Sequence, residues 1–210
     1  MIWQPPESSR LCITGKQGFG KSVKSSRYVK KIFRSTLWQP MRDWNIGEEI
    51  SVYEYLEEAP KYDGRMMGFT VRPTDYDEDT MKDEHEILCA EVYRIGAMCF
   101  IIEEVSQVCD NTKGEKPRRE YSRLLIEGRH RAVSMVTIGQ RFAQFPVSVR
   151  SSATRVLAFH QDEPRDVAAW EERIWPMECP KPINQLAKRE YIDWRAGDDG
   201  LNTIELCYSK

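Results

Sequence analysis

Residues 10–26 read RLCITGKQGFGKSVKSS, and this stretch decides the fold of the chain. It contains the G-x-x-x-x-G-K-[ST] spacing of a phosphate-binding loop, which begins at Gly15 and ends at Ser22, directly after a short apolar strand. Glycines let such a loop curl so that its backbone N–H groups point inward around a β-phosphate. The helix that follows directs the positive end of its dipole at the same anion. The stretch therefore predicts binding of a nucleoside triphosphate; the alternative is a glycine-rich turn that merely fits the pattern.

The side chains of this loop predict a nucleoside triphosphate and Mg²⁺ as the cofactors. Lys21 supplies a positive charge that reaches the β- and γ-phosphates, and Ser22 offers its hydroxyl to Mg²⁺. The residues predicted to contact the nucleotide are Gly15, Lys16, Gln17, Gly18, Phe19, Gly20, Lys21, Ser22 and Val23.

Composition limits the class of protein. A chain of 210 residues predicts one domain, residues 1–210, with a sizeable core. Its 31 Lys and Arg against 33 Asp and Glu give a net charge of −2, so contact with DNA requires local basic segments. The 6 cysteines include no C-x-x-C pair, which favours buried thiols in a reducing compartment over a zinc site. The longest uncharged apolar run, residues 95–102, is far short of the ~20 residues that span a bilayer, so we expect a soluble chain without a transmembrane segment.

Strand and helix patterns alternate along the chain. The predicted strands cover residues 11–14, 36–41, 66–72, 98–103, 132–138, 155–160 and 202–207. The predicted helices run from the phosphate loop to about Arg34 and over residues 84–95, 119–128, 166–174 and 183–194. This order predicts an α/β fold with a mainly parallel sheet and helices on both faces, in which ligands bind at the carboxyl ends of the strands. We expect the acidic residues 75–86 to form a solvated loop and a helix start rather than a cation site.

A second nucleotide motif follows the phosphate loop at residues 98–104, which read MCFIIEE. An apolar strand that ends in two carboxylates resembles a Walker B motif. Glu103 is then the predicted ligand on the side of Mg²⁺, and Glu104 the base that orients or deprotonates the attacking water. The first position is usually Asp, so the longer arm of Glu103 favours a water-mediated contact with Mg²⁺. The alternative is that both carboxylates form a solvated end of the strand.

A polar residue also ends the next strand, where Gly139 is followed by Gln140 and Arg141. The side chain of Gln140 at this edge of the sheet is predicted to hydrogen-bond the γ-phosphate or its attacking water. The alternative is a loop residue that caps the following segment.

The loop after the Walker B strand, residues 110–120, reads DNTKGEKPRRE and is strongly basic. Basic side chains there could hold DNA phosphates without reading sequence, as a sequence-blind motor requires. The alternative is a solvated charged loop. The predicted DNA contacts are Lys113, Lys116, Arg118 and Arg119.

Three motifs in this order carry a resemblance to a known family: GKQGFGKS, the strand that ends in Glu103 and Glu104, and LLIEGRHRAVSMVTIGQRFAQFPVSVRSSATRVLAFHQ at residues 124–161. Together they resemble the HerA/FtsK superfamily of ring-forming DNA-pumping ATPases. The small size and the GRH-strand-GQR-FP pattern are similar to the genome-packaging ATPases of viruses and phages with an internal membrane. The resemblance implies a RecA-like (ASCE) P-loop core in a pentameric or hexameric homo-oligomeric ring that hydrolyses ATP at subunit interfaces and drives double-stranded DNA through its centre. The nucleotide cofactor that the resemblance implies is therefore ATP.

The resemblance further implies an arginine that one subunit inserts beside its neighbour's γ-phosphate. Arg129 is favoured as this arginine. The alternative is that Arg129 only caps the C-terminus of the preceding helix or pairs with an acidic residue on the surface. The rival arginines are Arg119, Arg123 and Arg131. The implied partners are viral vertex or membrane proteins, and the implied location is the host cytoplasm or the packaging vertex of a virion. Two other functions stay open: an assembly ATPase, or a nucleotide-dependent switch that acts on a protein partner.

Overall fold

The computed structural model describes residues 9–30, 32, 34–41, 44–61, 67–197 and 201–209. The strands are β1 (Arg10–Thr14), β2 (Arg34–Trp38), β3 (Glu48–Ser51), β4 (Met67–Arg72), β5 (Cys99–Ile102), β6 (Ser134–Gly139), β7 (Arg155–Phe159), β8 (Glu190–Arg195) and β9 (Thr203–Tyr208). The helices are α1 (Lys21–Val29), α2 (Val52–Glu58), α3 (Glu78–Ile95), α4 (Arg119–Glu127), α5 (Val147–Ser152) and α6 (Pro164–Ile174). Every predicted strand is present, although Met66 lies outside the described residues.

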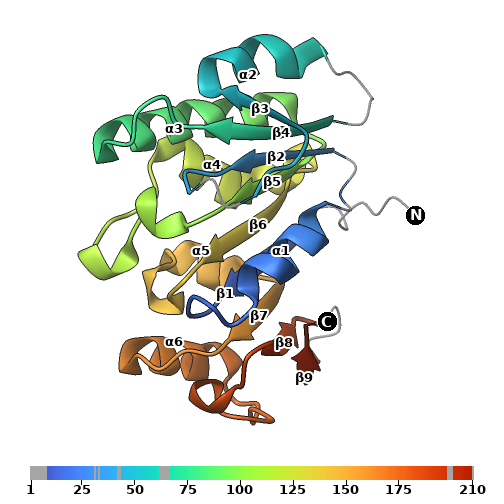
Figure 1. The fold of residues 1–210 in the computed structure, drawn as a ribbon, viewed down its shortest axis with the longest axis vertical. Coiled ribbons are helices and arrows are strands. Elements are labelled where there is room, and N and C mark those ends of the chain that lie inside the picture. The colour runs from blue at the N-terminus through green and yellow to red at the C-terminus, as the bar shows by residue number, and fades with distance from the viewer. Residues whose placement is uncertain are drawn as a thin grey trace.

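One sheet joins these strands in the order β3-β4-β2-β5-β6-β1-β7-β8-β9. Every pair from β3 to β7 in this order is parallel, and β8 and β9 continue the sheet in antiparallel fashion. The carboxyl ends of the parallel strands therefore meet along one edge, on the left in Figure 1. The mainly parallel α/β sheet is confirmed, and β6 lies between β1 and β5, so the two nucleotide motifs flank a third strand.

Two apolar clusters cover the two faces of the sheet. In β1, Leu11 and Ile13 belong to the cluster that includes Val29 of α1, while Cys12 belongs to the larger cluster formed with α2 to α6. Strands buried on both faces read as continuous apolar runs, which explains why β1, β5 and β6 are legible in the sequence. Helices on both faces are thus confirmed, with α1 in front of the sheet in Figure 1. No described helix is both long and apolar enough to cross a bilayer.

Helix α1 is shorter than the sequence predicts. It ends at Val29, and Arg34 begins β2, where it pairs with Met67 of β4. Ile32 lies beyond the end of the helix, but its buried side chain packs in the same apolar cluster as Val29. It therefore fits the apolar spacing without being helical. The strand pairing therefore ends the helix earlier than the apolar spacing suggests.

Helix α3 begins at Glu78, ahead of the predicted start at Glu84. Asp77 caps it, since its side chain accepts hydrogen bonds from the backbone N–H of Asp79 and of Thr80. The acidic stretch thus contains a helix start, as expected from the preference of carboxylates for this end of a helix.

The predicted helix over residues 183–194 is wrong. A short 3-10 turn at Ile183–Gln185 is followed by β8, which pairs with β7 on one side and β9 on the other. Ile192 and Trp194 face the larger apolar cluster, whereas Tyr191 faces the smaller one, so the true period is two. Asp193, which is polar yet buried, lies between Ile192 and Trp194 and interrupts the apolar pattern of the strand. Three elements of the structure, β3, α2 and α5, were not predicted from the sequence.

Candidate nucleotide-binding site

The phosphate loop connects β1 to α1 and requires glycine at two positions. Gly15 has a φ of 149°, and a Cβ placed there would lie 2.4 Å from Cβ of Phe159. Gly20, the N-cap of α1, has a φ of 100° in the left-handed region. Larger residues are strained at both positions, so the glycines of the motif serve the loop's shape as well as its approach to a ligand.

The end of β7 supports the loop from behind. The rings of Phe19 and His160 stack with centroids 4.3 Å apart, and the backbone N–H of Lys16 donates to the carbonyl of His160 at 2.9 Å. Lys16 also forms an ion pair with Asp162, and this hydrogen bond lowers the pKa of the Asp162 carboxyl. Gly15 and Phe19 therefore shape the loop from its packed side.

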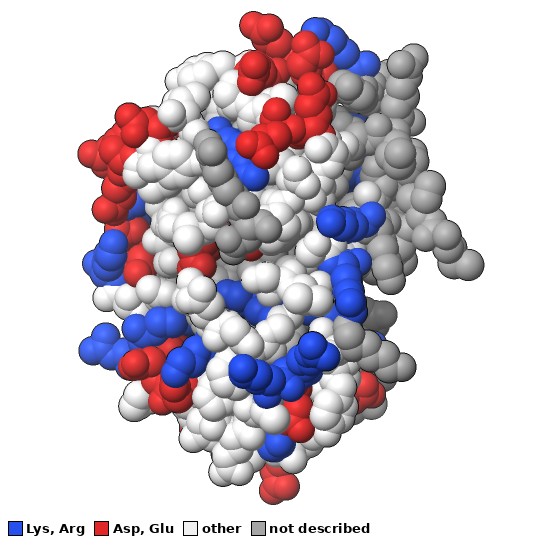
Figure 2. Space-filling view, in the orientation of Figure 1, with Lys and Arg blue, Asp and Glu red and all other residues white. Residues whose placement is uncertain are grey.

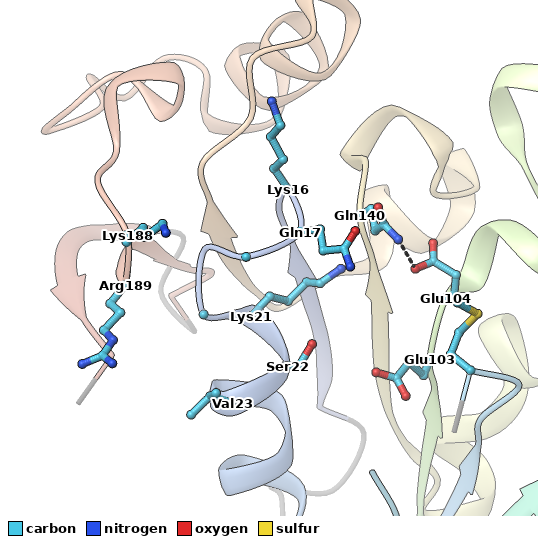
Figure 3. Close-up of a pocket in the computed structure, with 13 residues that line it drawn as sticks. Lys16, Gln17, Lys21, Ser22, Val23, Glu103, Glu104, Gln140, Lys188 and Arg189 are labelled. Atoms are coloured by element: carbon cyan, nitrogen blue, oxygen red, sulfur yellow. Dashed lines mark hydrogen bonds between the residues drawn. The ribbon is translucent and has the colours of Figure 1, made fainter. Parts of the chain in front are cut away.

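A cleft of about 560 Å³ opens between this loop and the ends of β5 and β6. The predicted residues in its wall are Lys16, Gln17, Gly18, Gly20, Lys21, Ser22, Val23, Glu103, Glu104 and Gln140. Figure 3 shows the buried Lys21 side chain directed along the cleft toward Gln140, and the Ser22 hydroxyl on the side of Glu103. Three further residues line the wall without a sequence motif that predicts them: Met41, Lys188 and Arg189.

Glu103 is buried at the end of β5 and fixed in position. Its Oε1 accepts a hydrogen bond from Nε1 of Trp44 at 2.7 Å, and its backbone N–H donates to the carbonyl of Trp38 at 3.0 Å. A hydroxyl and a carboxylate are oxygen ligands of the kind Mg²⁺ takes beside substrate phosphates, so Ser22 and Glu103 fit this ion. Trp44 lies far from both motifs in the sequence, and no spacing pattern identifies it.

Glu104 adopts an unusual backbone conformation beside Gln140. Its φ is 52° and its ψ 62°, in the left-handed region that residues with a Cβ rarely occupy. Its carboxylate accepts hydrogen bonds from Oγ of Ser106 at 2.9 Å and from Nε2 of Gln140 at 3.3 Å. Strain at a non-glycine residue that lines a cleft is typical of functional positions. The structure thus brings two of the predicted catalytic residues into contact (Figure 3).

The loop that carries Gln140 is anchored by buried polar side chains. The amide of Gln161 donates to Oγ1 of Thr14 at 2.7 Å and accepts from the backbone N–H of Phe142 at 3.3 Å. Buried Asp166 accepts from Nε of Arg141 at 3.0 Å and from the backbone N–H of Ala143 at 2.9 Å. The bond to Asp166 raises the pKa of Arg141. Gln161 therefore links the start of the phosphate loop to the loop after β6.

Arg129 lies at the opposite edge of the sheet. It belongs to the 3-10 turn Gly128–Arg131 and lines a separate pocket of about 310 Å³ together with Arg10, where β1 begins. Because β1 ends at the phosphate loop, this pocket is separated from the cleft by the length of the strand. The structure therefore does not bring Arg129 to the cleft of its own chain.

The rival arginines differ in their surroundings. Arg123 lies 3.9 Å above the ring of Tyr93, and Arg131 donates to the carbonyl oxygens of Tyr93 at 3.1 Å and Arg94 at 2.6 Å. Arg119 is 91% exposed at the start of α4. Like Arg129, none of these arginines lines the wall of the 560 Å³ cleft.

Acidic side chains accompany the predicted DNA-binding residues. Lys113 lies 4.0 Å from Glu78, Arg118 pairs with Asp83, and Nε of Arg119 is 3.5 Å from the neighbouring carboxylate of α4. Lys116 is exposed in the same loop. Figure 2 shows acidic and basic side chains close together on the left edge of the molecule, where this loop lies. These four residues do not line the nucleotide cleft.

Comparisons with known proteins find similarity in fold but not in sequence. No family model matches the sequence, and no curated protein matches it. The genome-packaging NTPase B204 of Sulfolobus turreted icosahedral virus 2, in complex with AMPPCP, superimposes with a TM-score of 0.70 at 13% identity, covering 96% of this chain and 98% of B204.

Two further solved structures share the fold. VirB4 of Thermoanaerobacter pseudethanolicus gives a TM-score of 0.67 at 12% identity, covering 100% of this chain and 92% of VirB4. The cytoplasmic domain of the type VII secretion ATPase EccC of Thermomonospora curvata gives a TM-score of 0.55 at 8% identity, covering 97% of this chain and 24% of the EccC chain. The predicted resemblance to viral genome-packaging ATPases is therefore confirmed for the fold, which is that of a P-loop NTPase.

Proposed function

We propose that this chain is an ATPase subunit of a double-stranded DNA translocase, of the kind that packages viral genomes. One observation carries the ATPase part: Lys21 of the phosphate loop and the contacting pair Glu104 and Gln140 lie in the wall of a single cleft. These residues come from three neighbouring strand ends, so the arrangement is a property of the fold and not of one loop.

The chain's own residues bind and orient the nucleotide. The backbone N–H groups of the loop and the N-terminus of α1 hold the phosphates, and Lys21 neutralises charge at the β- and γ-phosphates. The Ser22 hydroxyl would hold Mg²⁺ directly and the Glu103 carboxylate would hold it through a water, and the ion would withdraw charge from the phosphate oxygens. Trp44 keeps the Glu103 carboxylate in place through its indole N–H.

Hydrolysis then proceeds at the Gln140 end of the cleft. Gln140 orients a water in line with the bond between the γ-phosphorus and the bridging oxygen, and Glu104 takes up the proton as the water oxygen attacks. The bridging oxygen leaves with the electron pair of the broken bond as part of ADP. The hydrogen bond from Gln140 to Glu104 positions these two groups for the same water.

The DNA and ring parts of the proposal are supported by fold similarity and by geometry. B204, a genome-packaging NTPase, shares the fold along almost its whole length. Arg129 lies away from the cleft of its own chain, as an arginine that completes a neighbour's site must. A ring of identical subunits that meets viral vertex or membrane proteins, in the host cytoplasm or at the packaging vertex, follows from the same proposal.

ATP turnover with and without double-stranded DNA tests the function. We expect DNA to stimulate hydrolysis, and Glu104→Gln to retain ATP binding while lowering turnover by a factor on the order of 10² or more, the scale of general-base catalysis. Glu103→Gln should instead raise the Mg²⁺ concentration needed for activity. A second candidate is an assembly ATPase that acts on a protein partner, since the fold is shared with a secretion ATPase, EccC, as well as with a packaging NTPase. Vigorous turnover that DNA leaves unchanged would support this candidate, whereas normal turnover in both glutamate variants would exclude the proposed carboxylates.

A further inference from the structure

The cleft extends beyond the phosphate loop on the side away from Gln140. Val23, in the first turn of α1, forms one wall there, and Lys188 and Arg189 of the loop before β8 form the other. If the γ-phosphate lies beside Glu104 and the β-phosphate in the loop, the α-phosphate reaches the N-terminus of α1. The nucleoside must then leave the loop between Val23 and the residues before β8.

The backbone of Arg189 is fixed against the phosphate loop. Its N–H donates to the carbonyl of Phe19 at 3.0 Å, and its own carbonyl accepts from the N–H of Ser209 at 2.7 Å. A Cβ placed on Gly20 would lie 3.6 Å from Cα of Arg189, which itself has a φ of 70°. A non-glycine residue held in this conformation at a cleft is typical of a functional position. The wall is therefore preorganised, and its side chains need little further ordering to meet a ligand.

The side chains of this wall face the cleft. Lys188 and Arg189 are exposed, and neither forms an ion pair with any residue that the structure describes. Figure 3 shows Lys188 turned toward the phosphate loop and Arg189 directed along the first turn of α1, where Val23 points to the same side. Val23 is 51% exposed, so its side chain is accessible to a ligand in this part of the cleft.

We infer that this wall is the nucleoside subsite, in which the Arg189 guanidinium stacks on the base, Val23 contacts the base from the side of α1 and Lys188 approaches the α-phosphate. The inference rests on the proposed nucleotide binding and extends it. A planar guanidinium stacks on aromatic rings, which an ammonium group cannot do. Stacking tolerates every base because every base has a π-face, so ATP and GTP should bind with similar affinity.

Binding of MgATP and of magnesium tripolyphosphate, measured by calorimetry, tests this subsite because tripolyphosphate lacks the nucleoside. We expect Arg189→Ala to weaken MgATP by about tenfold, the scale of one stacked base, and to leave tripolyphosphate unchanged. Arg189→Lys keeps the charge and should bind MgATP as weakly as Arg189→Ala. Lys188→Ala should weaken both ligands. Arg94→Ala removes an exposed arginine at the C-terminal end of α3 and serves as the matched control, with both affinities unchanged.

The outcomes separate this inference from the proposed function. Equal loss of both ligands in Arg189→Ala, or full recovery of MgATP affinity in Arg189→Lys, would overturn base stacking while leaving the phosphate site intact. If the unaltered protein binds neither ligand, nucleotide binding itself fails. A strong preference of the unaltered protein for ATP over GTP would also contradict a subsite built on stacking.

Discussion

The two edges of the parallel sheet differ in what their side chains can do. At the carboxyl edge, Lys21, the carboxylates of Glu103 and Glu104 and the Gln140 amide lie around one cleft of about 560 Å³, so phosphate binding and water activation can occur together. At the amino edge, Arg10 and Arg129 line a pocket of about 310 Å³. The carboxyl edge thus holds the residues proposed for hydrolysis, and the arginine among its described wall residues, Arg189, lies on the side away from Gln140, whereas the amino edge holds arginines without such a set.

Charge is also distributed differently at the two edges. Burial lowers the pKa of Arg10, and the positive charge of Arg129 lowers it further. Within the part of the chain that the structure describes, the Arg10 guanidinium donates to the sulfur of Met135 at 3.2 Å and to the carbonyl of Leu124 at 3.5 Å, both uncharged acceptors. Such an edge favours an anionic neighbour, and the phosphates of a nucleotide bound to another subunit would supply one. Substitutions at one edge should therefore have effects distinct from substitutions at the other.

The largest effect is expected at the carboxyl edge. Lys21→Ala should abolish ATP hydrolysis and severely weaken ATP binding, because the β- and γ-phosphates lose their fixed cation. Lys24→Ala, one turn further along α1 with its ammonium 4.9 Å from the ring centre of Tyr191, is the matched control and should retain both properties. Calorimetric titration and a phosphate-release assay measure the two quantities. Unchanged affinity and turnover in Lys21→Ala would remove the basis of the proposed function.

A smaller loss is expected at the amino edge. Arg129→Ala should bind ATP with near-normal affinity yet turn it over about 10³-fold more slowly, since the arginine acts on charge that develops in the neighbour's transition state. Titration and steady-state kinetics separate the two effects. Loss of ATP binding in this variant would place Arg129 in a structural role at its own edge.

Mixing the two kinds of defective subunit sharpens the comparison. Arg129→Ala subunits keep the base, and Glu104→Gln subunits keep the arginine, so roughly a quarter of the interfaces in an equal, random ring regain both. Part of the activity should therefore return in a mixture shown by light scattering to co-assemble. Lack of rescue there would shift the assignment to Arg119 or Arg123. A rate that is independent of protein concentration down to a proven monomer would exclude hydrolysis at subunit interfaces.

The carboxyl edge could be predicted from the sequence because each of its parts is local. The phosphate loop has a fixed spacing, and β5 and β6 are buried on both faces, so their apolar runs and polar ends are visible without tertiary information. Helix α2 also carried a readable signal, since Ser51 and Glu54 form a capping box with the S-x-x-E pattern.

The antiparallel end of the sheet could not be read in this way. In β8, Asp193 is buried because Arg155 and Arg195 each pair with it at 2.6 Å, and this partnership across strands hides the strand period. Arg189 reaches the cleft only because β8 folds back beside β7. Gln161 likewise gains its role from Thr14 and Phe142, which lie on other elements. Residues whose contacts arise from chain reversal leave no spacing pattern in the sequence.

The smallest effect is expected in the loop over residues 110–120, which follows β5 and lies at the carboxyl edge but outside the cleft. Replacing Lys113, Lys116, Arg118 and Arg119 together with alanine should weaken DNA binding and flatten its salt dependence by about one unit of log–log slope for each lost phosphate contact. The total should be less than the number of residues removed, because Glu78 and Asp83 already share the charge of two of them.

The carboxylates of Glu78 and Asp83 beside this loop provide a control for the role of its basic residues. Glu78→Gln combined with Asp83→Asn frees Lys113 and Arg118 from their carboxylates, so it should strengthen DNA binding and steepen the salt slope. Fluorescence anisotropy of a labelled duplex over a range of salt concentrations measures both variants. Opposite shifts from the two variants would locate DNA at the carboxyl edge, beside the proposed site of ATP hydrolysis. If neither variant changes the affinity or the slope, the loop is a solvated surface, and the DNA path must run along another part of the subunit.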